Sequence, residues 1–177
     1  MLCNLNSPIK RRRLLGLLAA WPLAGLANAL PDLPTAGLRR WGSGEFRRFG
    51  FLIYEATLWA GDDPTRPPLA LQLSYQRYIQ GQALAEASAA EMRKLGIAEE
   101  ALVARWSAAL ARIFPDVRPG DDLIGLYLPE GAHFHQDGRW LGSIREPAFA
   151  RAFFGIWLDA RTSAPELRAA LLQNPAR

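Results

Sequence analysis

Residues 42–60 read GSGEFRRFGFLIYEATLWA, a stretch in which strand-forming side chains follow a glycine-rich start. The pattern predicts a turn at Gly42–Gly44 and then a long strand over Phe46–Trp59. Successive side chains of a strand point to opposite faces, which sorts the apolar ones into two sets. One set is Leu52, Tyr54, Ala56 and Leu58, and the other is Phe49, Phe51, Ile53 and Trp59. Because both faces are largely apolar, we expect this strand to lie inside a sheet.

The flanking residues predict two further strands. Leu38–Trp41 forms a short strand ahead of the glycines. A loop with prolines and acidic residues occupies 61–68, and its Asp62 and Asp63 are interpreted as a solvated turn. From residue 69 to 79, apolar side chains alternate with mostly polar ones, which is typical of a half-buried strand.

Two helices are predicted next. Residues 82–95 carry apolar side chains at helical spacing, and Gly96 is well placed to end that helix. Residues 98–114 repeat the spacing until Pro115 stops the helix. The methionine and aromatic side chains on these stripes are interpreted as core contacts.

The following segment predicts a strand and a hairpin. Residues 123–128 form the strand. Asp137-Gly138 is typical of a two-residue type I′ turn, here joining residues 132–136 to 139–144. With that turn, His135 would pair with Trp140, and each later pair would follow without interruption.

Two more helices complete the chain. One is predicted from Pro147, since proline suits the first helical turn. The other is predicted from Ser163, where Glu166 three residues later would complete a capping box. The order of three strands, two helices, three strands and two helices predicts an α+β domain, a large antiparallel sheet with its helices on one side.

Residues 1–29 have the parts of a secretory signal peptide. In order these are the basic run Lys10–Arg13, the apolar run Leu14–Leu26 and the small-residue cleavage motif Ala27–Ala29. Pro22 and Gly25 interrupt the apolar run, which is shorter than the ~20 residues that a membrane span needs. We therefore expect cleavage, a single domain over 30–177, no stable membrane span, and a periplasmic or secreted location. Either the general or the twin-arginine export route fits.

Removal of that segment also removes the apparent basicity of the chain. The whole sequence has 21 Lys+Arg and 17 Asp+Glu. Lys10–Arg13 supplies four of the basic residues and residues 1–29 contain no acidic one, so 17 of each remain. A neutral domain gives no reason to expect a nucleic-acid partner. The single cysteine, Cys3, lies in the removed segment, which leaves no disulfide or catalytic thiol.

The most conspicuous chemical motif is His133-Phe134-His135, which contains both histidines of the chain. The two imidazoles share a strand face and lie roughly 7 Å apart along the strand. A structural or catalytic zinc needs at least a third protein ligand, and the facing strand offers only Trp140 and Gly142. We therefore expect no metal site, with the histidines on the outer face of the sheet beside an indole.

Other catalytic signatures are missing from the sequence. It contains no G-x-S-x-G motif, no phosphate-binding loop and no dinucleotide-binding fingerprint. The carboxylate pairs Glu99-Glu100 and Asp121-Asp122 fall at a helix start and a turn exit, where solvated charge is the ordinary reading. No cofactor is expected.

Five segments in order carry a resemblance to a known family. They are residues 42–60 as quoted above, LSYQRYIQGQALAEASAAEMRKLG at 73–96, FPDVRPGDDLIGLYLP at 114–129, FHQDGRWLGSI at 134–144 and PAFARAFFGIWLDARTSAPELRAALL at 147–172. Together they resemble the bacterial secreted branch of the chalcone isomerase-like family, from about Leu38 to Leu172. The resemblance implies an open-faced β-sandwich: a large antiparallel sheet, helices layered on one face, and a ligand cleft between them.

The resemblance does not carry the isomerase reaction with it. Plant chalcone isomerases close a flavanone ring with an arginine, a threonine, a tyrosine and an asparagine. Matching the motifs puts Tyr54 at the threonine, Leu84 at the tyrosine and Glu91 at the asparagine. A leucine and a carboxylate cannot donate to the phenolate that the cyclisation develops. We expect no chalcone cyclisation.

Fatty-acid-binding relatives of this fold hold a carboxylate with an arginine and a tyrosine, and Tyr54 matches that tyrosine's strand motif. The arginine has no clean match, because Arg40, Arg47 and Arg48 only flank its expected place. Tyr75 and Arg77 on the next strand could also approach Tyr54. These six residues are the candidate ligand contacts.

The leading hypothesis is a non-catalytic periplasmic binding domain for a small hydrophobic, fatty-acid-like ligand. The alternative is an isomerase or intramolecular lyase with a rearranged site, in which Tyr54 donates a proton and an arginine stabilises an anion. A module that binds a protein through exposed aromatic side chains is a third option. The sequence leaves any protein partner open.

Overall fold

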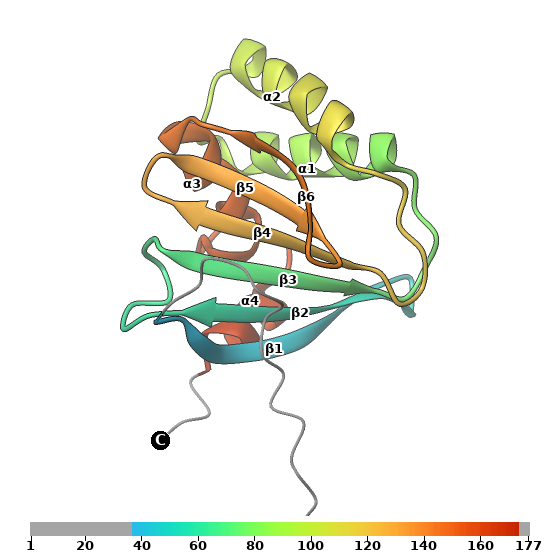
Figure 1. Ribbon diagram of the computed structural model, residues 1–177, viewed down its shortest axis with the longest axis vertical. Coiled ribbons are helices and arrows are strands. Elements are labelled where there is room, and N and C mark those ends of the chain that lie inside the picture. The colour runs from blue at the N-terminus through green and yellow to red at the C-terminus, as the bar shows by residue number, and fades with distance from the viewer. Residues whose placement is uncertain (1–36, 174–177) are drawn as a thin grey trace, which may run out of the picture.

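The computed structural model describes residues 37–173. The predicted signal peptide at 1–29 lies outside these residues. The strands are β1 (Arg39–Arg48), β2 (Phe51–Ala60), β3 (Leu69–Tyr75), β4 (Asp122–Leu128), β5 (Gly131–Gln136) and β6 (Arg139–Ile144). They form one six-stranded sheet in the order β1-β2-β3-β4-β5-β6, with every neighbouring pair antiparallel (Figure 1). The predicted α+β class is confirmed.

The described residues also form four helices: α1 (Gly81–Leu95), α2 (Glu100–Ile113), α3 (Pro147–Leu158) and α4 (Pro165–Leu172). In Figure 1, α3 and α4 lie behind the sheet, while α1 and α2 stand beyond the β6 side. Each predicted strand and helix occurs in the predicted order. None of the helices in the described part of the chain is long and apolar enough to cross a membrane.

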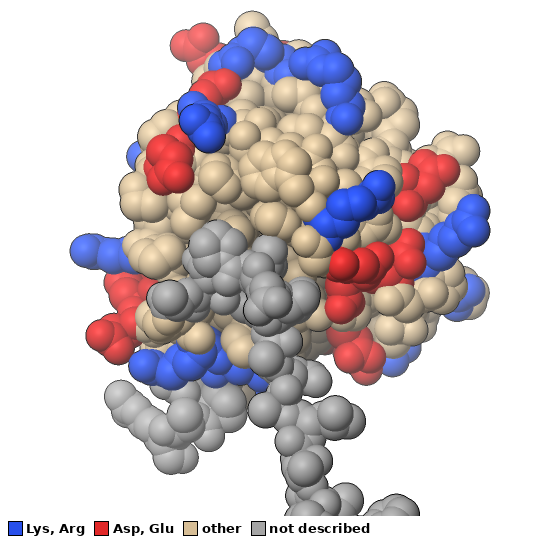
Figure 2. All heavy atoms as spheres, viewed as in Figure 1, with Lys and Arg blue, Asp and Glu red and all other residues tan. Residues whose placement is uncertain are grey.

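The two faces of the sheet bury different sets of side chains. The inner face packs against the helices, and its large buried residues include Leu58, Leu71 and Phe134. On the outer face, a smaller apolar cluster consists of Trp59, Ala70, Ile124 and Leu126. Figure 2 looks onto this outer face, where charged side chains gather toward the rim around an uncharged centre, outside the part that grey atoms cover.

The turn predicted at Gly42–Gly44 is wrong, because both glycines lie inside β1. A Cβ atom on Gly42 would overlap the backbone oxygens of Ala170 and Leu171 in α4, and one on Gly44 would lie 2.8 Å from Cβ of Ala170. The glycines therefore allow a helix to approach the strand closely. The chain turns instead at Phe49-Gly50, where φ is 52° and 82°. The single strand predicted over Phe46–Trp59 is therefore wrong at its start, because residues 46–48 belong to β1 and β2 begins at Phe51.

Two element ends also differ from the prediction. Strand β3 ends at Tyr75, and Ile79 forms only an isolated bridge with Val117. Helix α4 begins at Pro165 with Ala164 at its N-cap, where no side chain caps the helix. The capping box predicted at Ser163 is therefore absent.

The hairpin of β5 and β6 has the predicted turn but a different register. Asp137 and Gly138 both have positive φ, as a type I′ turn requires. His135 pairs with Trp140 as expected, but a bulge then moves Phe134 opposite Gly142 and His133 opposite Ser143. A bulge adds one residue to one strand, and alternation in the sequence does not reveal it.

Candidate ligand-binding cavity

A cavity of about 590 Å³ lies between the inner face of the sheet and helices α1 and α3. Its volume is within the range of small-molecule sites. Its apolar walls include Phe46, Leu73, Ile79, Leu84, Phe114, Leu123, Phe153, Ile156 and Trp157. Its polar and charged lining residues are Arg47, Arg48, Tyr54, Tyr75, Ser88, Glu91, Lys94, Thr162 and Ser163. A cavity with an apolar wall and a separate set of polar and charged groups is suited to a hydrophobic molecule that carries a polar end.

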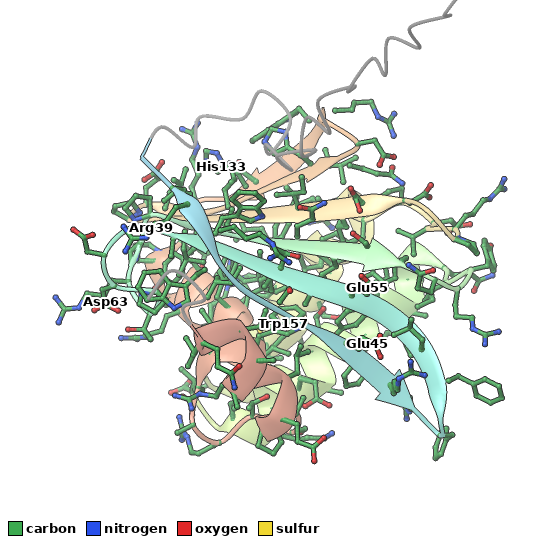
Figure 3. All side chains as sticks on the ribbon, turned by 90° about the horizontal axis from the view of Figure 1, so that it is seen from below. Arg39, Glu45, Glu55, Asp63, His133 and Trp157 are labelled. Atoms are coloured by element: carbon green, nitrogen blue, oxygen red, sulfur yellow. The ribbon has the colours of Figure 1, made fainter. Side chains whose placement is uncertain are left out.

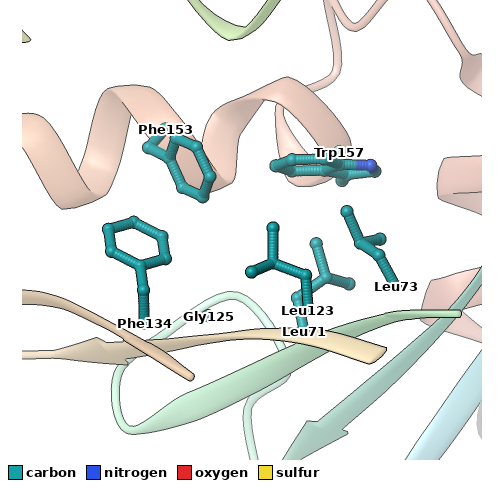
Figure 4. Close-up of a pocket in the computed structure, with 7 residues that line it drawn as sticks. All are labelled: Leu71, Leu73, Leu123, Gly125, Phe134, Phe153 and Trp157. Atoms are coloured by element: carbon teal, nitrogen blue, oxygen red, sulfur yellow. The ribbon is translucent and has the colours of Figure 1, made fainter. Parts of the chain in front are cut away.

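Beside this cavity, side chains of the sheet and of α3 pack tightly and fill the space between the two layers. A second void of about 10 Å³ lies between Leu71, Gly125 and Phe134 of the sheet and Phe153 and Trp157 of α3 (Figure 4). A void of this size holds one water molecule at most. The large cavity and the small void share Phe153 and Trp157, so these two side chains form part of the wall between open space and packed core.

Tyr54 is fixed in the cavity wall by three aromatic neighbours. It lies opposite Phe46 of β1 and Tyr75 of β3, with ring centres 5.0 Å and 5.7 Å away. The indole Nε1 of Trp157 donates a hydrogen bond of 3.1 Å to the Tyr54 hydroxyl oxygen. An indole N–H can only donate, so the Tyr54 hydroxyl accepts here and keeps its own proton for another acceptor.

Burial raises the pKa of Tyr54 well above its ordinary value, although the Trp157 hydrogen bond acts in the opposite direction. The hydroxyl is therefore neutral at physiological pH and remains a hydrogen-bond donor. No second hydrogen bond involves this hydroxyl among the bonds between described residues.

Tyr75 brings a second phenol to the same wall. The residue is 3% exposed and lies across from Tyr54. Burial, followed by the proximity of Tyr54, raises its pKa, so it too stays protonated. No hydrogen bond among residues 37–173 involves its hydroxyl, and this oxygen is not among the fully buried polar atoms of these residues that lack a partner. The hydroxyl therefore reaches the open space of the cavity, where a ligand acceptor can receive its hydrogen bond.

Charged side chains from α1 and β1 line the cavity beside these tyrosines. Burial favours the neutral form of Glu91, but hydrogen bonds from Lys94 and Ser163, and the charges of Lys94 and Arg48, outweigh it and lower its pKa. Lys94 donates to Glu91 over 2.6 Å. Arg47 is held by Glu45 at 2.7 Å. Arg48 forms none of the ion pairs between described residues, which leaves it available to an anion.

The structure brings four of the six candidate ligand contacts together and separates the other two. Arg47, Arg48, Tyr54 and Tyr75 line the cavity. Arg40 does not, and its guanidinium donates to Ser43 at the exposed surface over 2.7 Å. Arg77 also lies outside, 5.0 Å from the ring centre of Phe51. Tyr75 ends β3, and Arg77 follows after the alternation has ended.

The two histidines lie on the opposite side of the sheet from this cavity. Figure 3 shows His133 on the far side of the strands from Trp157. The rings of His133 and His135 each lie 5.2 Å from the Trp140 ring, as the sequence predicted. Between residues 37 and 173, no group of three or more His, Cys, Asp or Glu side chains is placed to hold a metal ion.

The sequence reasoning missed Trp157 as a site residue. Its place on an apolar helical stripe predicted a core contact, and 7% exposure agrees with that. Its hydrogen bond to Tyr54 crosses 103 residues of sequence. The motif match to the isomerase positions did indicate Leu84 and Glu91, and both line the cavity.

The chain has an α+β fold: an open-faced antiparallel sheet backed by helices, with a cavity between the two layers. The chain belongs to the chalcone isomerase-like family, whose model matches residues 52–173. The resemblance inferred from the sequence is therefore confirmed at the level of the family.

Two further comparisons found similar proteins. An uncharacterized protein of Haemophilus influenzae is 26% identical over 134 residues, which is 74% of this chain and 66% of the relative. The chain thus spans just under two thirds of that relative's length. The crystal structure of an Arabidopsis thaliana fatty-acid binding protein superposes with a TM-score of 0.62 at 11% identity, covering 81% of this chain and 89% of the other. This likeness confirms the predicted open-faced fold.

Proposed function

We propose that the protein binds a small hydrophobic molecule with an acidic end, such as a fatty acid, and performs no reaction on it. The observation that carries this proposal is the Trp157–Tyr54 hydrogen bond at the wall of a largely apolar cavity. It leaves the Tyr54 proton free to donate. A carboxylate accepts such a bond, and charge-assisted hydrogen bonds are stronger than neutral ones.

The arrangement of charge suggests how the ligand lies. An isolated carboxylate in an apolar interior is expensive, so the acidic end belongs near a cation. The charge of Arg48 helps to lower the pKa of Glu91, and the charge of Glu91 helps to raise the pKa of Tyr54, so the three groups lie near one another. We place the carboxylate between Arg48 and the tyrosines, with the apolar tail along Leu84 and Phe153. The Arabidopsis structural neighbour is a fatty-acid binding protein, which supports this ligand class.

The isomerase alternative is less well supported. It uses Tyr54 as a proton donor, and a general acid works best with a pKa near the operating pH. The pKa of Tyr54 is raised instead. We expect no ring closure of a 2′-hydroxychalcone above the uncatalysed rate. A large enzyme-dependent excess would favour the isomerase.

We also propose that the protein is exported and belongs to the bacterial secreted branch of its family. The signal-like residues 1–29 support export, and the match to a bacterial relative supports the bacterial branch. The N-terminal residue of protein recovered from its host tests this. Cleavage after Ala29 would leave Leu30 first, whereas an intact N-terminus would contradict export with cleavage.

The ligand itself is best identified by native mass spectrometry of protein purified from its own host. We expect an added mass in the range of a fatty acid, released on denaturation. The matched test is Leu84→Trp, which places an indole in the cavity, compared with Leu84→Met, which nearly conserves volume. Retention of the ligand by the methionine variant alone would support the cavity as the site. Equal retention by both would place the ligand elsewhere.

A further inference from the structure

Three aromatic side chains project into solvent at one end of the sheet. Phe49 is 88% exposed, Phe51 58% and Tyr78 54%. Phe49 lies in the β1–β2 turn, and Phe51 is the first residue of β2. Tyr78 lies in the β3–α1 connection, at the same end of the sheet (Figure 1). Arg77 joins the two connections, because its guanidinium lies 5.0 Å from the Phe51 ring centre. We name this surface the aromatic tip; it consists of Arg48, Phe49, Phe51, Arg77 and Tyr78.

Phe49, the first residue of the β1–β2 turn, is of a type that this turn disfavours. Phe49 has φ of 52°, a left-handed conformation that asparagine, aspartate and glycine adopt most readily. A bulky residue there is strained. The Phe49 ring is also almost fully exposed, so it gains little from packing in the fold. A strained and exposed aromatic side chain at a loop tip points to contact with something outside the domain.

The aromatic tip carries positive charge that no acidic partner neutralises. Arg48 lies 5.5 Å from the Phe49 ring centre. Neither Arg48 nor Arg77 takes part in an ion pair between described residues. Among the acidic groups on the neighbouring elements, Glu45 pairs with Arg47 and Glu91 with Lys94, whereas Asp116 accepts from Tyr78 and the Gly81 amide. Glu55 of β2 lies opposite Glu45 and forms none of the ion pairs between described residues. Arg48 and Arg77 therefore present their charges at the aromatic tip without a paired carboxylate.

We propose that the aromatic tip docks the protein on an anionic phospholipid bilayer. Phe49 and Phe51 enter the interfacial region, where aromatic side chains are favoured, and Arg48 and Arg77 contact the headgroups. Arg48 also lines the cavity, so docking places the cavity opening next to the bilayer. That orientation would let a hydrophobic ligand pass between lipid and protein without crossing water. The transfer role rests on the proposed function, but the docking does not.

The test uses processed protein, with removal of residues 1–29 verified by intact mass, and vesicles made of phosphatidylcholine alone or with an equal part of phosphatidylglycerol. We expect co-sedimentation with the anionic vesicles, little with the neutral ones, and weaker binding as salt is raised. Phe49→Asn should weaken vesicle binding about tenfold, the effect of losing one buried aromatic side chain. Asparagine suits the turn, so this variant should fold at least as well as the natural sequence.

Matched variants separate the tip from general effects. Arg77→Gln should weaken anionic vesicle binding about fivefold. Arg66→Gln removes an 81% exposed arginine side chain from the β2–β3 loop at the other end of β2, and should leave binding unchanged. Trp140→Ser removes an exposed aromatic side chain from β6, at the opposite edge of the sheet, and should also leave it unchanged.

Several outcomes would overturn the docking proposal. One is no binding of the natural sequence to anionic vesicles at low salt, and another is equal binding to both vesicle types. A third is undiminished binding by Phe49→Asn. Self-association that Phe49→Asn abolishes, without vesicle binding, would assign the tip to a protein contact. Ligand titration without vesicles is a separate readout, so failure of the cavity proposal would leave the vesicle result standing.

Discussion

Two clusters of ring side chains lie on opposite faces of the sheet. Each contains one tryptophan and two other rings, but they differ in hydrogen bonding and packing. The cavity cluster is Tyr54, Tyr75 and Trp157, and the hairpin cluster is His133, His135 and Trp140. In the cavity cluster, the Trp157 indole donates to the Tyr54 hydroxyl, which leaves the tyrosine proton free to donate elsewhere. In the hairpin cluster, Trp140 packs edge-on against both imidazoles. Nε2 of His133 and Nδ1 of His135 are buried without a hydrogen-bond partner among the described residues.

The difference shows that the chemically conspicuous motif is not the candidate site. His-x-His is visible in the sequence because the two residues are neighbours, and neighbours on one strand can share a face without sharing a cavity. The cavity cluster is assembled from β2, β3 and α3, which are far apart along the chain. A candidate site forms where the sheet and the helices separate, and that separation depends on packing across the whole domain.

Truncating the tryptophan of each cluster should give the largest difference in stability between the two clusters. Trp157→Ala should lower the free energy of unfolding by about 3 kcal/mol, because the side chain is 7% exposed and its ring centre lies 5.4 Å from that of Phe153. Trp140→Ala should cost about 1 kcal/mol or less, since that side chain is 52% exposed. Denaturant unfolding of both variants measures this. Equal losses would show that the two clusters contribute alike to the core.

Removing the Tyr54 hydroxyl should weaken ligand binding while preserving ring packing. We expect Tyr54→Phe to lower fatty-acid affinity by about 0.5–1.5 kcal/mol, rising to about 3 kcal/mol if the partner is a carboxylate. Titration of delipidated protein with a fluorescent fatty acid measures the change. Tyr127→Phe is the control, because Tyr127 stacks on Phe154 outside the cavity. An unchanged affinity in Tyr54→Phe would remove this tyrosine from the site.

Tyr75→Phe distinguishes the two phenols from one another. It should weaken ligand binding by about 1 kcal/mol, as Tyr54→Phe does, but without lowering the stability of the empty protein. Its hydroxyl has no partner among the described residues, whereas Tyr54→Phe leaves the Trp157 N–H without an acceptor. Thermal unfolding of both delipidated variants tests the contrast. A loss in Tyr75→Phe as large as in Tyr54→Phe would reveal a protein partner for Tyr75.

The hairpin cluster should tolerate loss of its histidines. We expect His133→Ala combined with His135→Ala to change stability by about 1 kcal/mol or less, because the imidazole packing that is lost is offset by removal of buried nitrogens without partners. Ligand affinity should stay the same. A metal ion bound one-to-one in the natural sequence, and lost in the double variant, would reverse the interpretation of His-x-His.

The smallest effect is a pH dependence confined to the hairpin cluster. Burial lowers the pKa of His135, with a smaller contribution from His133. The unfolded chain therefore binds a proton more readily than the folded one, and stability falls as pH drops below the unfolded histidine value of about 6.5. Denaturant unfolding between about pH 7.5 and pH 5.5 should show this fall, and the double variant should flatten it. A rise in stability toward low pH would contradict it.

Sequence patterns predicted the elements well because they are local signals. Alternation identified the inner face of β2, and the Asp137-Gly138 turn and the helix-ending Gly96 occur as expected. The glycine signal at Gly42–Gly44 failed because a glycine serves a tight turn and a close helix approach equally well. The predicted register of β5 and β6 was wrong at the bulge for a related reason, since register depends on neighbours across the sheet.

The candidate site was predictable only in part. Tyr54 was found because it matches the strand motif of the fatty-acid-binding relatives, and Tyr75 because it lies on the next strand. The match of Leu84 and Glu91 to family positions indicated two more residues of the cavity wall. Four arginines could not be ranked from the sequence, because a long flexible side chain near a strand end can reach several places. Trp157 was read as core because its hydrogen bond to β2 leaves no trace in the pattern of α3.

The close approach of α4 to β1 has a consequence for the order of events during synthesis. The last helix completes the inner face of the first strand, and the Trp41 indole donates to the Leu172 carbonyl across 131 residues of sequence. An isolated helix as short as α4 is unstable in water, so it forms only when it docks. Strand β1 therefore waits for residues 165–172, and a growing or truncated polypeptide that stops before Pro165 should remain open along β1.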